Sequence, residues 1–377
     1  MRIKIIDGFR AIAVLGVLWI HTWTFYGNPS YAIGGIDLAK LMSFFGNGVD
    51  LFFVISGFCM YLMYANKKAE ITFTYYWQYL KKRWLRIAPA FYAAIIVYGL
   101  FHVSFNLYFF DVMYALQNAL FIRTLFIEPT QYAPHFWSLC TEWHFYIILP
   151  FVLIGIKKSS FLKTMIITAI ICLVFRAIAW HENNDPFNII NYLIVNRLIE
   201  FIIGIAIAYL YLKGNKSWIN KRISGLFIGI AIAFAGRLLI SAGFANRTDL
   251  AGMMARVLNL PLLTLGFGVA ILNTLQNTSF FSRFLESKLM TSIGKYSYSM
   301  YLWHWVVAER MVFFLKGIGN FNLFLQVNLV FILSLLVLFP ISKLSYILFE
   351  SIYFNKKRFT KISGVEEAYP VTIHSRK

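Results

Sequence analysis

The chain has 377 residues, of which 59% are hydrophobic and only 14% charged, and its formal net charge at pH 7 is +19. A globular core needs fewer apolar residues than this, so the composition excludes an ordinary water-soluble domain and indicates a protein that crosses a membrane repeatedly. Because most Lys and Arg residues stand between the apolar runs, membrane topology explains the basic balance, and we expect no nucleic-acid partner.

Apolar runs of about 20 residues recur from one end of the chain to the other, and a helix of that length crosses a hydrocarbon layer of roughly 30 Å. We predict ten transmembrane helices, separated by short polar segments, in an all-α polytopic membrane protein. In chain order they cover residues 5–25, 44–64, 88–107, 136–156, 162–180, 189–212, 223–242, 253–273, 293–315 and 322–350.

The distribution of basic residues predicts the orientation, since cytoplasmic loops hold most of the Lys and Arg of a membrane protein. With the N-terminus inside, the cytoplasmic segments carry 24 basic residues and the outer loops carry four. This asymmetry predicts that both termini are cytoplasmic. We expect residues 1–355 to form one transmembrane domain and residues 356–377 to form a short basic cytoplasmic tail.

The first predicted helix contains FRAIAVLGVLWIH, which places an arginine and a histidine eleven positions apart. At about 100° per residue, eleven residues end roughly 20° beyond three full turns, so Arg10 and His21 share a helix face and lie about 16 Å apart along the axis. One interpretation is that Arg10 reaches the inner headgroups while His21 anchors the outer interface. The other is that both line a site.

Two carboxylates are predicted at the depth of His21, in the outer third of the membrane. Asp50 lies near the start of the second span, and Glu142 lies about two turns into the fourth. Such groups cost several kcal/mol each in an apolar layer unless they face one another or water. General acid–base chemistry uses a carboxylate to orient an imidazole, and a proton-relay transporter would use the same residues.

The three cysteines, Cys59, Cys140 and Cys172, all lie in predicted spans and form no CxxC pair. We therefore expect neither a disulfide framework nor a metal site, and we interpret the cysteines as small packing residues. His135 and His144 are likewise assigned to packing or to the membrane interface.

Six segments occur in the order found in acyltransferase family 3, and the chain resembles this family from Ile6 to about Glu350. They read IDGFRAIAVLGVLWIH, GNGVDLFFVISGFCMYL, KRWLRIAPAFY, FWSLCTEWHFYIILP, NRLIEFIIGIAIA and IGKYSYSMYLWHW. Each segment alone is weakly specific, but six in register are strong. Members are integral-membrane enzymes that O-acylate cell-surface carbohydrates, so the resemblance implies an O-acyltransferase. Some members carry an added extracytoplasmic esterase-like domain, and from its length we expect this chain to lack one.

The resemblance also implies roles for individual residues. In the family, an Arg and a His separated by ten residues on the first helix are tied to catalysis and acyl-donor use, which implies these roles for Arg10 and His21. The family's serine- and glutamate-bearing motif corresponds to Ser138 and Glu142. The last segment reads FESIYF, without the proline often found after the glutamate, so no role is carried over to Glu350.

Further candidates for lining the site come from two other segments. A family motif of the form RxxEFxxG corresponds to Arg197, Glu200 and Gly204, although two charges three residues apart on a helix also pair for structural reasons alone. His304 stands beside Trp303 in the aromatic run YLWHW. An interfacial aromatic belt explains the tryptophan, whereas the histidine could also line an acceptor cavity.

Acyl-CoA is the donor that the resemblance implies, and a cytosolic anionic donor needs a basic mouth on the inner face. The predicted loop KKRWLR supplies Lys81, Lys82, Arg83 and Arg86. Positive-inside topology is the preferred explanation for the two lysines. Arg86 begins the third span at the depth of Arg10, so we expect these two guanidiniums to flank one polyphosphate through bidentate bonds.

These expectations describe a membrane O-acetyltransferase of a bacterial inner membrane, with acetyl-CoA as co-substrate and no bound cofactor. His21 would act as general base on a hydroxyl of a surface polysaccharide, such as lipopolysaccharide O-antigen or exopolysaccharide, or of its lipid-linked precursor. Asp50 or Glu142 would orient the imidazole while Arg10 and Arg86 hold the donor. Two alternatives are acylation of a small cytoplasmic glycoside or lipid, and a proton-coupled exporter, although the paired repeats typical of exporters are not visible.

Overall fold

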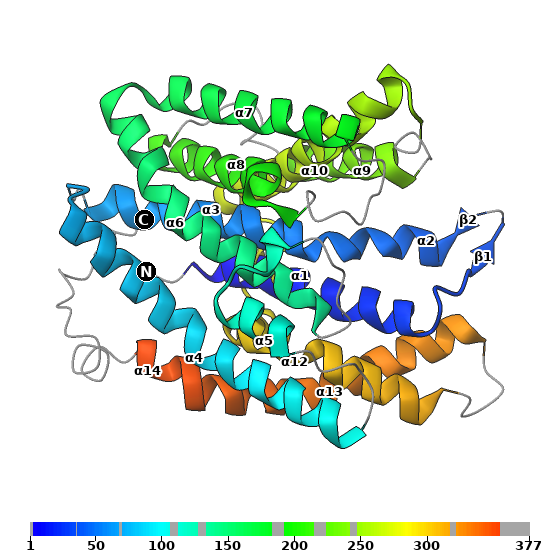
Figure 1. The fold of residues 1–377 in the computed structure, drawn as a ribbon. Helices are drawn as coiled ribbons and strands as arrows, with labels where there is room; N and C mark the ends of the chain where they lie inside the picture. The colour runs from blue at the N-terminus through cyan, green and yellow to red at the C-terminus, as the bar shows by residue number, and fades with distance from the viewer. Residues whose placement is uncertain are drawn as a thin grey trace.

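The computed structural model of the protein describes residues 3–34, 36–67, 70–105, 112–126, 133–182, 192–214, 224–241, 247–316 and 322–354. The α-helices are α1 (Lys4–Phe25), α2 (Leu38–Met42), α3 (Gly48–Lys67), α4 (Phe73–Phe105), α5 (Val112–Ala119), α6 (Trp137–Lys158), α7 (Phe161–Glu182), α8 (Ile194–Lys213), α9 (Ser224–Ser241), α10 (Leu250–Gln276), α11 (Phe280–Leu285), α12 (Lys288–Leu315), α13 (Leu323–Ser345) and α14 (Ser351–Phe354). Short 3-10 segments include Ser43–Asn47, Arg123–Leu125 and Pro134–Phe136, and Tyr346–Glu350 is π-helical. A two-residue antiparallel hairpin joins β1 (Ala32–Ile33) to β2 (Ile36–Asp37). The predicted all-α class is confirmed (Figure 1).

Seven helical segments among the described residues are long and apolar enough to cross a membrane, and they contain α1, α3, α6, α7, α8, α10 and α13. The other three predicted crossings coincide with α4, α9 and α12. Of these, α9 has only 18 residues, and α4 and α12 carry charged and polar side chains along their length. The count of ten crossings and the cytoplasmic position of the termini stay predictions. The predicted tail, residues 356–377, lies outside the described residues.

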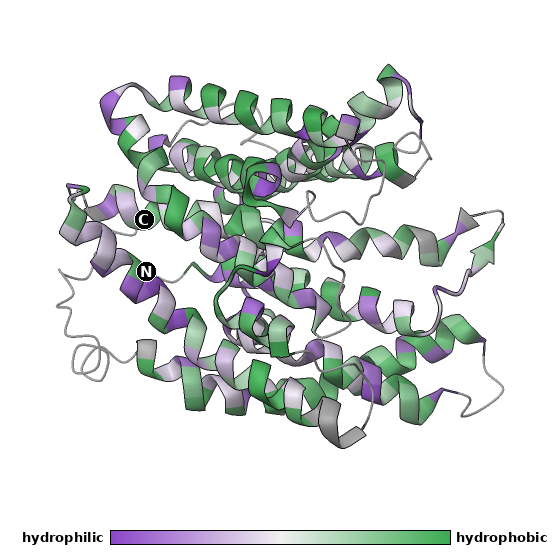
Figure 2. Ribbon diagram, viewed as in Figure 1, coloured by the Kyte–Doolittle hydropathy of each residue, from purple (hydrophilic) through white to green (hydrophobic). Residues whose placement is uncertain are grey.

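The peripheral helices α7 and α13 consist largely of hydrophobic residues (Figure 2), many of which are exposed on the outside of the bundle. On α7, every fourth residue from Leu162 to Ile178 is an exposed Leu, Ile or Val. A continuous apolar stripe of this length is costly in water and favourable against lipid. These faces therefore indicate where the bundle meets the hydrocarbon layer.

Glycines let the central helices approach one another closely. α1 runs through the middle of the bundle and packs against α3 and α12 (Figure 1). A Cβ atom at Gly294 would lie 1.9 Å from the Asp7 carbonyl oxygen, and one at Gly204 would lie 2.0 Å from the Val54 carbonyl oxygen. A larger residue cannot occupy either position without a backbone shift, so α1 and α12, and likewise α3 and α8, are in backbone contact.

The contacts also fix the relative directions of the helices. α1 and α12 run in the same direction, and so do α3 and α8, whereas α1 and α3 run in opposite directions. α1 and α12 correspond to the first and ninth predicted crossings, and α3 and α8 to the second and sixth. These are the directions that ten alternating crossings would give.

The basic segment KKRWLR lies inside a helix and not in a loop, so the prediction for this segment was wrong. α4 is continuous from Phe73 to Phe105 and accommodates Pro89 within it. The charges suggested a loop, but Lys and Arg are good helix formers whose aliphatic stems pack on apolar surface. One consequence is that Arg83 is buried.

Candidate active site

A pair of histidines joins the parallel helices α1 and α12. Nδ1 of His21 lies 3.0 Å from Nε2 of His304. His304 is completely buried, whereas His21 is partly exposed. The indole ring of Trp305 packs edge-on against His21 with 4.8 Å between ring centroids. His21 is thus the accessible member of a fixed pair of imidazoles.

His135 adds a third imidazole to this cluster. Its ring centroid lies 4.8 Å from that of His304, and its ring stacks on Trp305 at 5.8 Å. Nε2 of His135 lies 3.3 Å from the Leu302 carbonyl oxygen, and Nδ1 has no hydrogen-bond partner among the described residues. The sequence prediction assigned His135 to packing. The signal that could have marked it is its position three residues before Ser138, in the serine-bearing motif.

The hydroxyl of Tyr98, on α4, enters the backbone of α12 beside His304. It donates to the Leu302 carbonyl oxygen at 3.0 Å and accepts from the Val306 N–H at 3.2 Å. These two backbone groups are the pair that one helical hydrogen bond ordinarily joins. A side chain inserted in this way loosens the helix locally, and at the same level Nδ1 of His304 lies 2.6 Å from the Tyr301 carbonyl oxygen.

Ser138, at the start of α6, is held by structural bonds. Its hydroxyl oxygen lies 2.6 Å from the Tyr301 hydroxyl oxygen and 3.2 Å from the His135 carbonyl oxygen. The Tyr301 hydroxyl donates to that carbonyl at 2.9 Å, which leaves its oxygen able to accept the Ser138 proton. Trp303 lies on the other side of α12 from this contact and stacks on Tyr98. Ser138 thus ties α6 to α12, and its hydroxyl contacts no imidazole ring in the described part of the chain.

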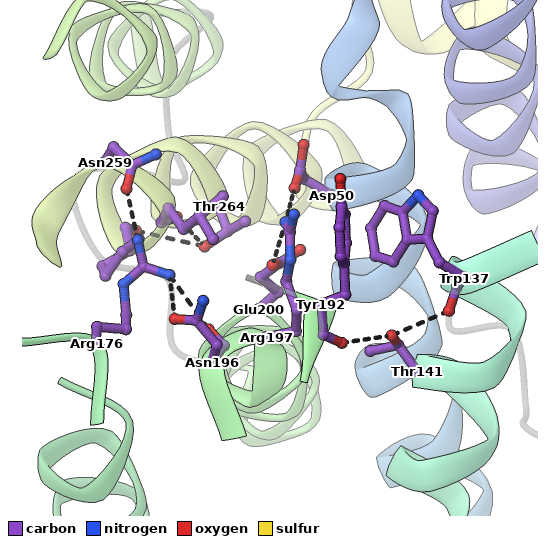
Figure 3. Close-up of polar contacts among 12 residues, drawn as sticks. Asp50, Trp137, Thr141, Arg176, Tyr192, Asn196, Arg197, Glu200, Asn259 and Thr264 are labelled. Atoms are coloured by element: carbon purple, nitrogen blue, oxygen red, sulfur yellow. Dashed lines mark hydrogen bonds and ion pairs between the residues drawn. The ribbon is translucent and has the colours of Figure 1, made fainter. Parts of the chain in front are cut away.

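Asp50, Arg197 and Glu200 form a buried charge cluster between α3 and α8 (Figure 3). Arg197 donates through one nitrogen to Asp50 at 2.8 Å and to Glu200 at 3.1 Å. Its guanidinium lies over the Trp137 ring, 5.0 Å from the centroid. Arg197 and Glu200 do pair, which is one of the two interpretations of their spacing, and Asp50 joins that pair.

A second buried arginine, Arg176 on α7, balances the cluster. It donates to side-chain oxygens of Asn196 at 2.8 Å and Asn259 at 2.6 Å (Figure 3). It also donates to the Val257 carbonyl oxygen at 3.0 Å, which lacks its helical partner because the ring of Pro261, four residues on, has no N–H. Arg176 is an electrostatic neighbour of both carboxylates, and Arg237 is a further one of Asp50. These nearby cations lower the cost of burying the two carboxylates.

Neither carboxylate that was expected to orient His21 contacts it in the described structure. Asp50 is bound to Arg197. Glu142 accepts hydrogen bonds at 2.7 Å from the hydroxyls of Ser56 and Tyr146. Asp50 and Glu142 were predicted at the same depth as His21, but their side chains face other partners. His304 is the residue that faces His21.

At the end of α1 away from His21, two arginines donate hydrogen bonds to sulfur atoms of α3. Arg10 donates to Asp7 at 3.1 Å and to the Cys59 sulfur at 3.4 Å. Buried Arg83 donates to the Met63 sulfur at 3.6 Å, and its Nε has no hydrogen-bond partner among the described residues. Cys59 and Met63 are one turn apart, about 6 Å along the helix. Because sulfur is a weak acceptor, Arg83 keeps much of its capacity to bind an anion, and so does the terminal nitrogen of Arg10 that faces Cys59 and not Asp7. Cys59 is therefore more than a packing residue.

Arg86 lies one turn further along α4 and interacts electrostatically with Glu350. Glu350 is buried at the π-helical turn, where the Ser299 hydroxyl donates to it at 2.5 Å. Tyr298, on α12, is an electrostatic neighbour of both Arg86 and Glu350. Arg86 thus has a carboxylate near it, whereas Arg83 has a thioether.

Metal ligation finds no support in the described residues, because no group of three His, Cys, Asp or Glu side chains there could hold an ion. The side chains present instead offer an accessible imidazole at one level and arginines with spare donors at another. This combination suits transfer of a group from an anionic donor to a hydroxyl.

Comparison with known proteins identifies the family. Residues 3–343 match the model of acyltransferase family 3, which is described as an acyltransferase domain. The chain is 26% identical over 330 residues to the O-acetyltransferase OatA of Staphylococcus aureus (strain NCTC 8325 / PS 47), covering 80% of this chain and 50% of the relative. It is 26% identical over 329 residues to the peptidoglycan O-acetyltransferase OatA of Listeria monocytogenes serovar 1/2a, covering 80% and 49%. No solved structure matches.

The chain spans about half the length of these curated relatives. The family match nevertheless covers most of the chain, from the first described residue to Lys343 in the last turn of α13. The multiple membrane-spanning helices agree with it. The chain therefore belongs to acyltransferase family 3, a family of membrane enzymes that transfer acyl groups.

Proposed function

We propose that this protein is a membrane O-acetyltransferase that moves the acetyl group of cytoplasmic acetyl-CoA to a hydroxyl of a surface polysaccharide, or of its lipid-linked precursor. Lipopolysaccharide O-antigen and exopolysaccharide are acceptors of this class. The names of the relatives support acetyl as the group transferred. The observation that carries the proposal is the arrangement on α1, where one helix holds an accessible imidazole and an arginine with spare donors.

The acceptor end is built around His21. The ring is partly exposed, and among the described side chains its hydrogen-bond contact is with His304. No carboxylate in the described structure is bonded to it. A general base needs a free lone pair within reach of the proton that it takes. We assign His21 as the catalytic residue that accepts the proton of the acceptor hydroxyl.

The donor end is built around Arg10, Arg83 and Arg86. A coenzyme A donor carries several phosphate charges, and arginine binds phosphate through paired N–H groups. Arg10, on α1, and Arg83, on α4, donate to sulfur atoms on neighbouring turns of α3, and Arg10 also pairs with Asp7 of its own helix. Arg10 lies about 16 Å from His21 along the helix, at 1.5 Å per residue. An extended donor bound at the arginines would direct its thioester toward the imidazole.

The transfer step follows from these positions. As His21 takes the hydroxyl proton, the acceptor oxygen attacks the thioester carbonyl carbon and a C–O bond forms. The C–S bond then breaks, and the coenzyme A thiolate leaves and is protonated. The products are an acetyl ester and free coenzyme A. Ser138 is held by Tyr301 and a backbone carbonyl, so direct transfer fits better than an acyl-serine intermediate.

The two carboxylates of the predicted catalytic set act away from the imidazole in this proposal. Asp50, through Arg197, holds α3 against α8. Glu142 accepts from Ser56 on α3 and from Tyr146 on its own helix. Since α3 also supplies the sulfur atoms under Arg10 and Arg83, we propose that both carboxylates position the donor end. We place the enzyme in a bacterial inner membrane, because the relatives are bacterial.

Purified protein and radiolabelled acetyl-CoA test the proposal. His21→Ala should leave donor binding near normal and lower turnover by about 10² to 10⁴, the usual contribution of positioned proton transfer. His21→Gln should restore little, because an amide cannot accept the proton. The wild-type rate should fall as the pH drops through the imidazole pKa, ordinarily about 6.5.

His181→Ala provides the matched control, because His181 is exposed at the end of α7. This variant should keep wild-type turnover. If His21→Gln keeps most of the wild-type turnover, the general-base assignment is wrong. If the purified protein consumes no acetyl-CoA but vesicles containing it move a solute against a pH gradient, the protein is a proton-coupled exporter.

A further inference from the structure

We propose that His304 is a positioning residue that fixes His21 in the tautomer whose proton is on Nδ1, so that Nε2 carries the lone pair that meets the acceptor hydroxyl. The catalytic meaning of this inference rests on the proposed function. The tautomer itself is a property of the folded protein and can be measured without any activity.

The first step concerns the proton on His304. Nδ1 of His304 lies 2.6 Å from the carbonyl oxygen of Tyr301. A carbonyl oxygen can accept a hydrogen bond but cannot donate one. Nδ1 of His304 must therefore carry a proton.

The second step concerns the charge on His304. Its ring is fully buried, and its titratable neighbours among the described residues are His21, His135 and Tyr301, whose ring centroid lies 5.2 Å away. His135 in turn is an electrostatic neighbour of Arg123. These groups are neutral or cationic, and a second proton on His304 would place a charge in an apolar layer without a carboxylate to balance it. His304 is therefore neutral, and its Nε2 carries a lone pair.

The third step follows from the contact between the two histidines. Nε2 of His304 lies 3.0 Å from Nδ1 of His21. Two bare lone pairs repel at that distance, so the nitrogen of His21 must be the donor. A neutral imidazole has only one N–H. Nε2 of His21 is then the bare nitrogen, and His21 is the ring of the pair that is partly exposed.

The surrounding side chains hold His304 in this arrangement. The Tyr98 hydroxyl bonds to the Leu302 carbonyl oxygen and to the Val306 N–H. Nε2 of His135 also lies close to the Leu302 carbonyl. Backbone groups on both sides of His304 are thus bound by Tyr98 of α4 and by His135. The ring itself contacts the Tyr301 carbonyl oxygen through Nδ1 and His21 through Nε2, so a ring flip that exchanges its two nitrogens would break both contacts.

The same hydrogen bonds show where the proton from the acceptor goes. When His21 becomes an imidazolium, its Nδ1–H bond to His304 becomes charge-assisted and stronger. The proton cannot travel further along the chain, because the bond beyond His304 ends on the Tyr301 carbonyl oxygen, which does not pass protons on. The arrangement therefore suits a base that returns its proton to the leaving group and not a transmembrane proton wire.

Nitrogen NMR of the purified full chain labelled with ¹⁵N-histidine tests the inference, because protonated and bare ring nitrogens give separate signals. With the His21 signals identified by their absence in His21→Ala, the wild type should show Nδ1 protonated and Nε2 bare at a pH above the imidazole pKa. His304→Gln should keep this pattern, since its side-chain oxygen can accept from Nδ1. His304→Met, of similar size but without a good acceptor, should shift His21 toward the Nε2–H form.

Kinetics of the same variants give the second readout. His304→Met should lower kcat by about 10-fold to 100-fold, because a hydrogen bond to a charged group is lost in the transition state. KM for acetyl-CoA should be unchanged, and His304→Gln should recover most of kcat. His135→Met is the matched control from the same cluster and should leave the Nδ1–H signal of His21 in place.

The inference is wrong if the dominant tautomer of His21 in the wild type carries its proton on Nε2. It is also wrong if His304→Met and His304→Gln have equal turnover. Should His304→Met fail to fold, the wild-type and His304→Gln spectra decide the question without it. Should the protein transfer no acetyl group yet show Nδ1–H, the proposed function fails and the tautomer assignment stands.

Discussion

The donor site gives the sharpest perturbation, because Arg83 is a buried cation that the fold hardly uses. Its guanidinium donates to the Met63 thioether at 3.6 Å, and its Nε has no hydrogen-bond partner in the described part of the chain. Arg83→Gln removes one weak hydrogen bond and a long cation–π contact with the Tyr79 ring, whose centroid lies 5.9 Å from the guanidinium. A guanidinium bound to phosphate instead contributes about 1.5 to 3 kcal/mol, as hydrogen bonds to charged groups do.

We therefore expect Arg83→Gln to raise the Kd for acetyl-CoA by about 10-fold to 150-fold, at 1.4 kcal/mol for each factor of ten. The unfolding temperature should hardly change. Equilibrium dialysis with labelled donor measures the first quantity, and tryptophan fluorescence during heating measures the second. Turnover at saturating donor should stay close to wild type, because the loss is one of binding.

Two control variants separate phosphate binding from general effects. Lys81→Gln removes an exposed charge on the same helix and should do little, since exposed lysines are screened by salt. Arg176→Gln removes a buried arginine whose partners include two asparagine side-chain oxygens. It should lower the unfolding temperature and leave the donor Kd unchanged. An unchanged Kd in Arg83→Gln, or a loss of stability as large as that of Arg176→Gln, would refute the reasoning.

Three further predictions concern the topology, the buried charges and the helix packing. Reporter fusions at residue 30 and residue 160 should give signals from outside and inside, respectively, and the reverse pattern would invert the predicted topology. Arg197→Met should destabilise the protein by about 3 to 5 kcal/mol, because it leaves Asp50 and Glu200 buried without their cation. Adding Asp50→Asn and Glu200→Gln should recover much of that stability in thermal unfolding. If no stability is recovered, the pairing is contradicted. Gly294→Ala should cost about 1 to 3 kcal/mol by forcing α1 from α12, and unchanged stability and turnover would show that the helices are not so close.

Local patterns predicted the fold class and much of the bundle. The positions of α1, α3 and α6 follow from apolar length, and the pairing of Arg197 with Glu200 follows from their spacing of three residues. The segment containing Arg83 was wrongly predicted to be a loop, because its charge density was given more weight than the helix propensity of Lys and Arg. The structure shows that propensity and packing of the stems decide there.

Contacts between distant segments were beyond sequence patterns. His21 and His304 are 283 residues apart, and both were candidates, but no local periodicity could pair them. The prediction that a carboxylate orients His21 rested on equal depth alone. Depth along a helix is readable from a sequence, whereas the direction in which a side chain faces depends on how α1, α3, α6 and α12 pack. His135 and Tyr98 were missed for the same reason, since their importance lies in what they contact on α12.

The central claim is that His21 is the base through which this protein acetylates a surface glycan. The most direct test is the acetyl-ester content of purified surface glycans from cells that carry the wild type, His21→Gln or no copy of the gene, at matched expression of the two proteins. We expect acetyl esters with the wild type and the background level of the gene-free cells with His21→Gln. Glycans acetylated to the wild-type level by His21→Gln, or acetylated equally in cells without the gene, would contradict the account.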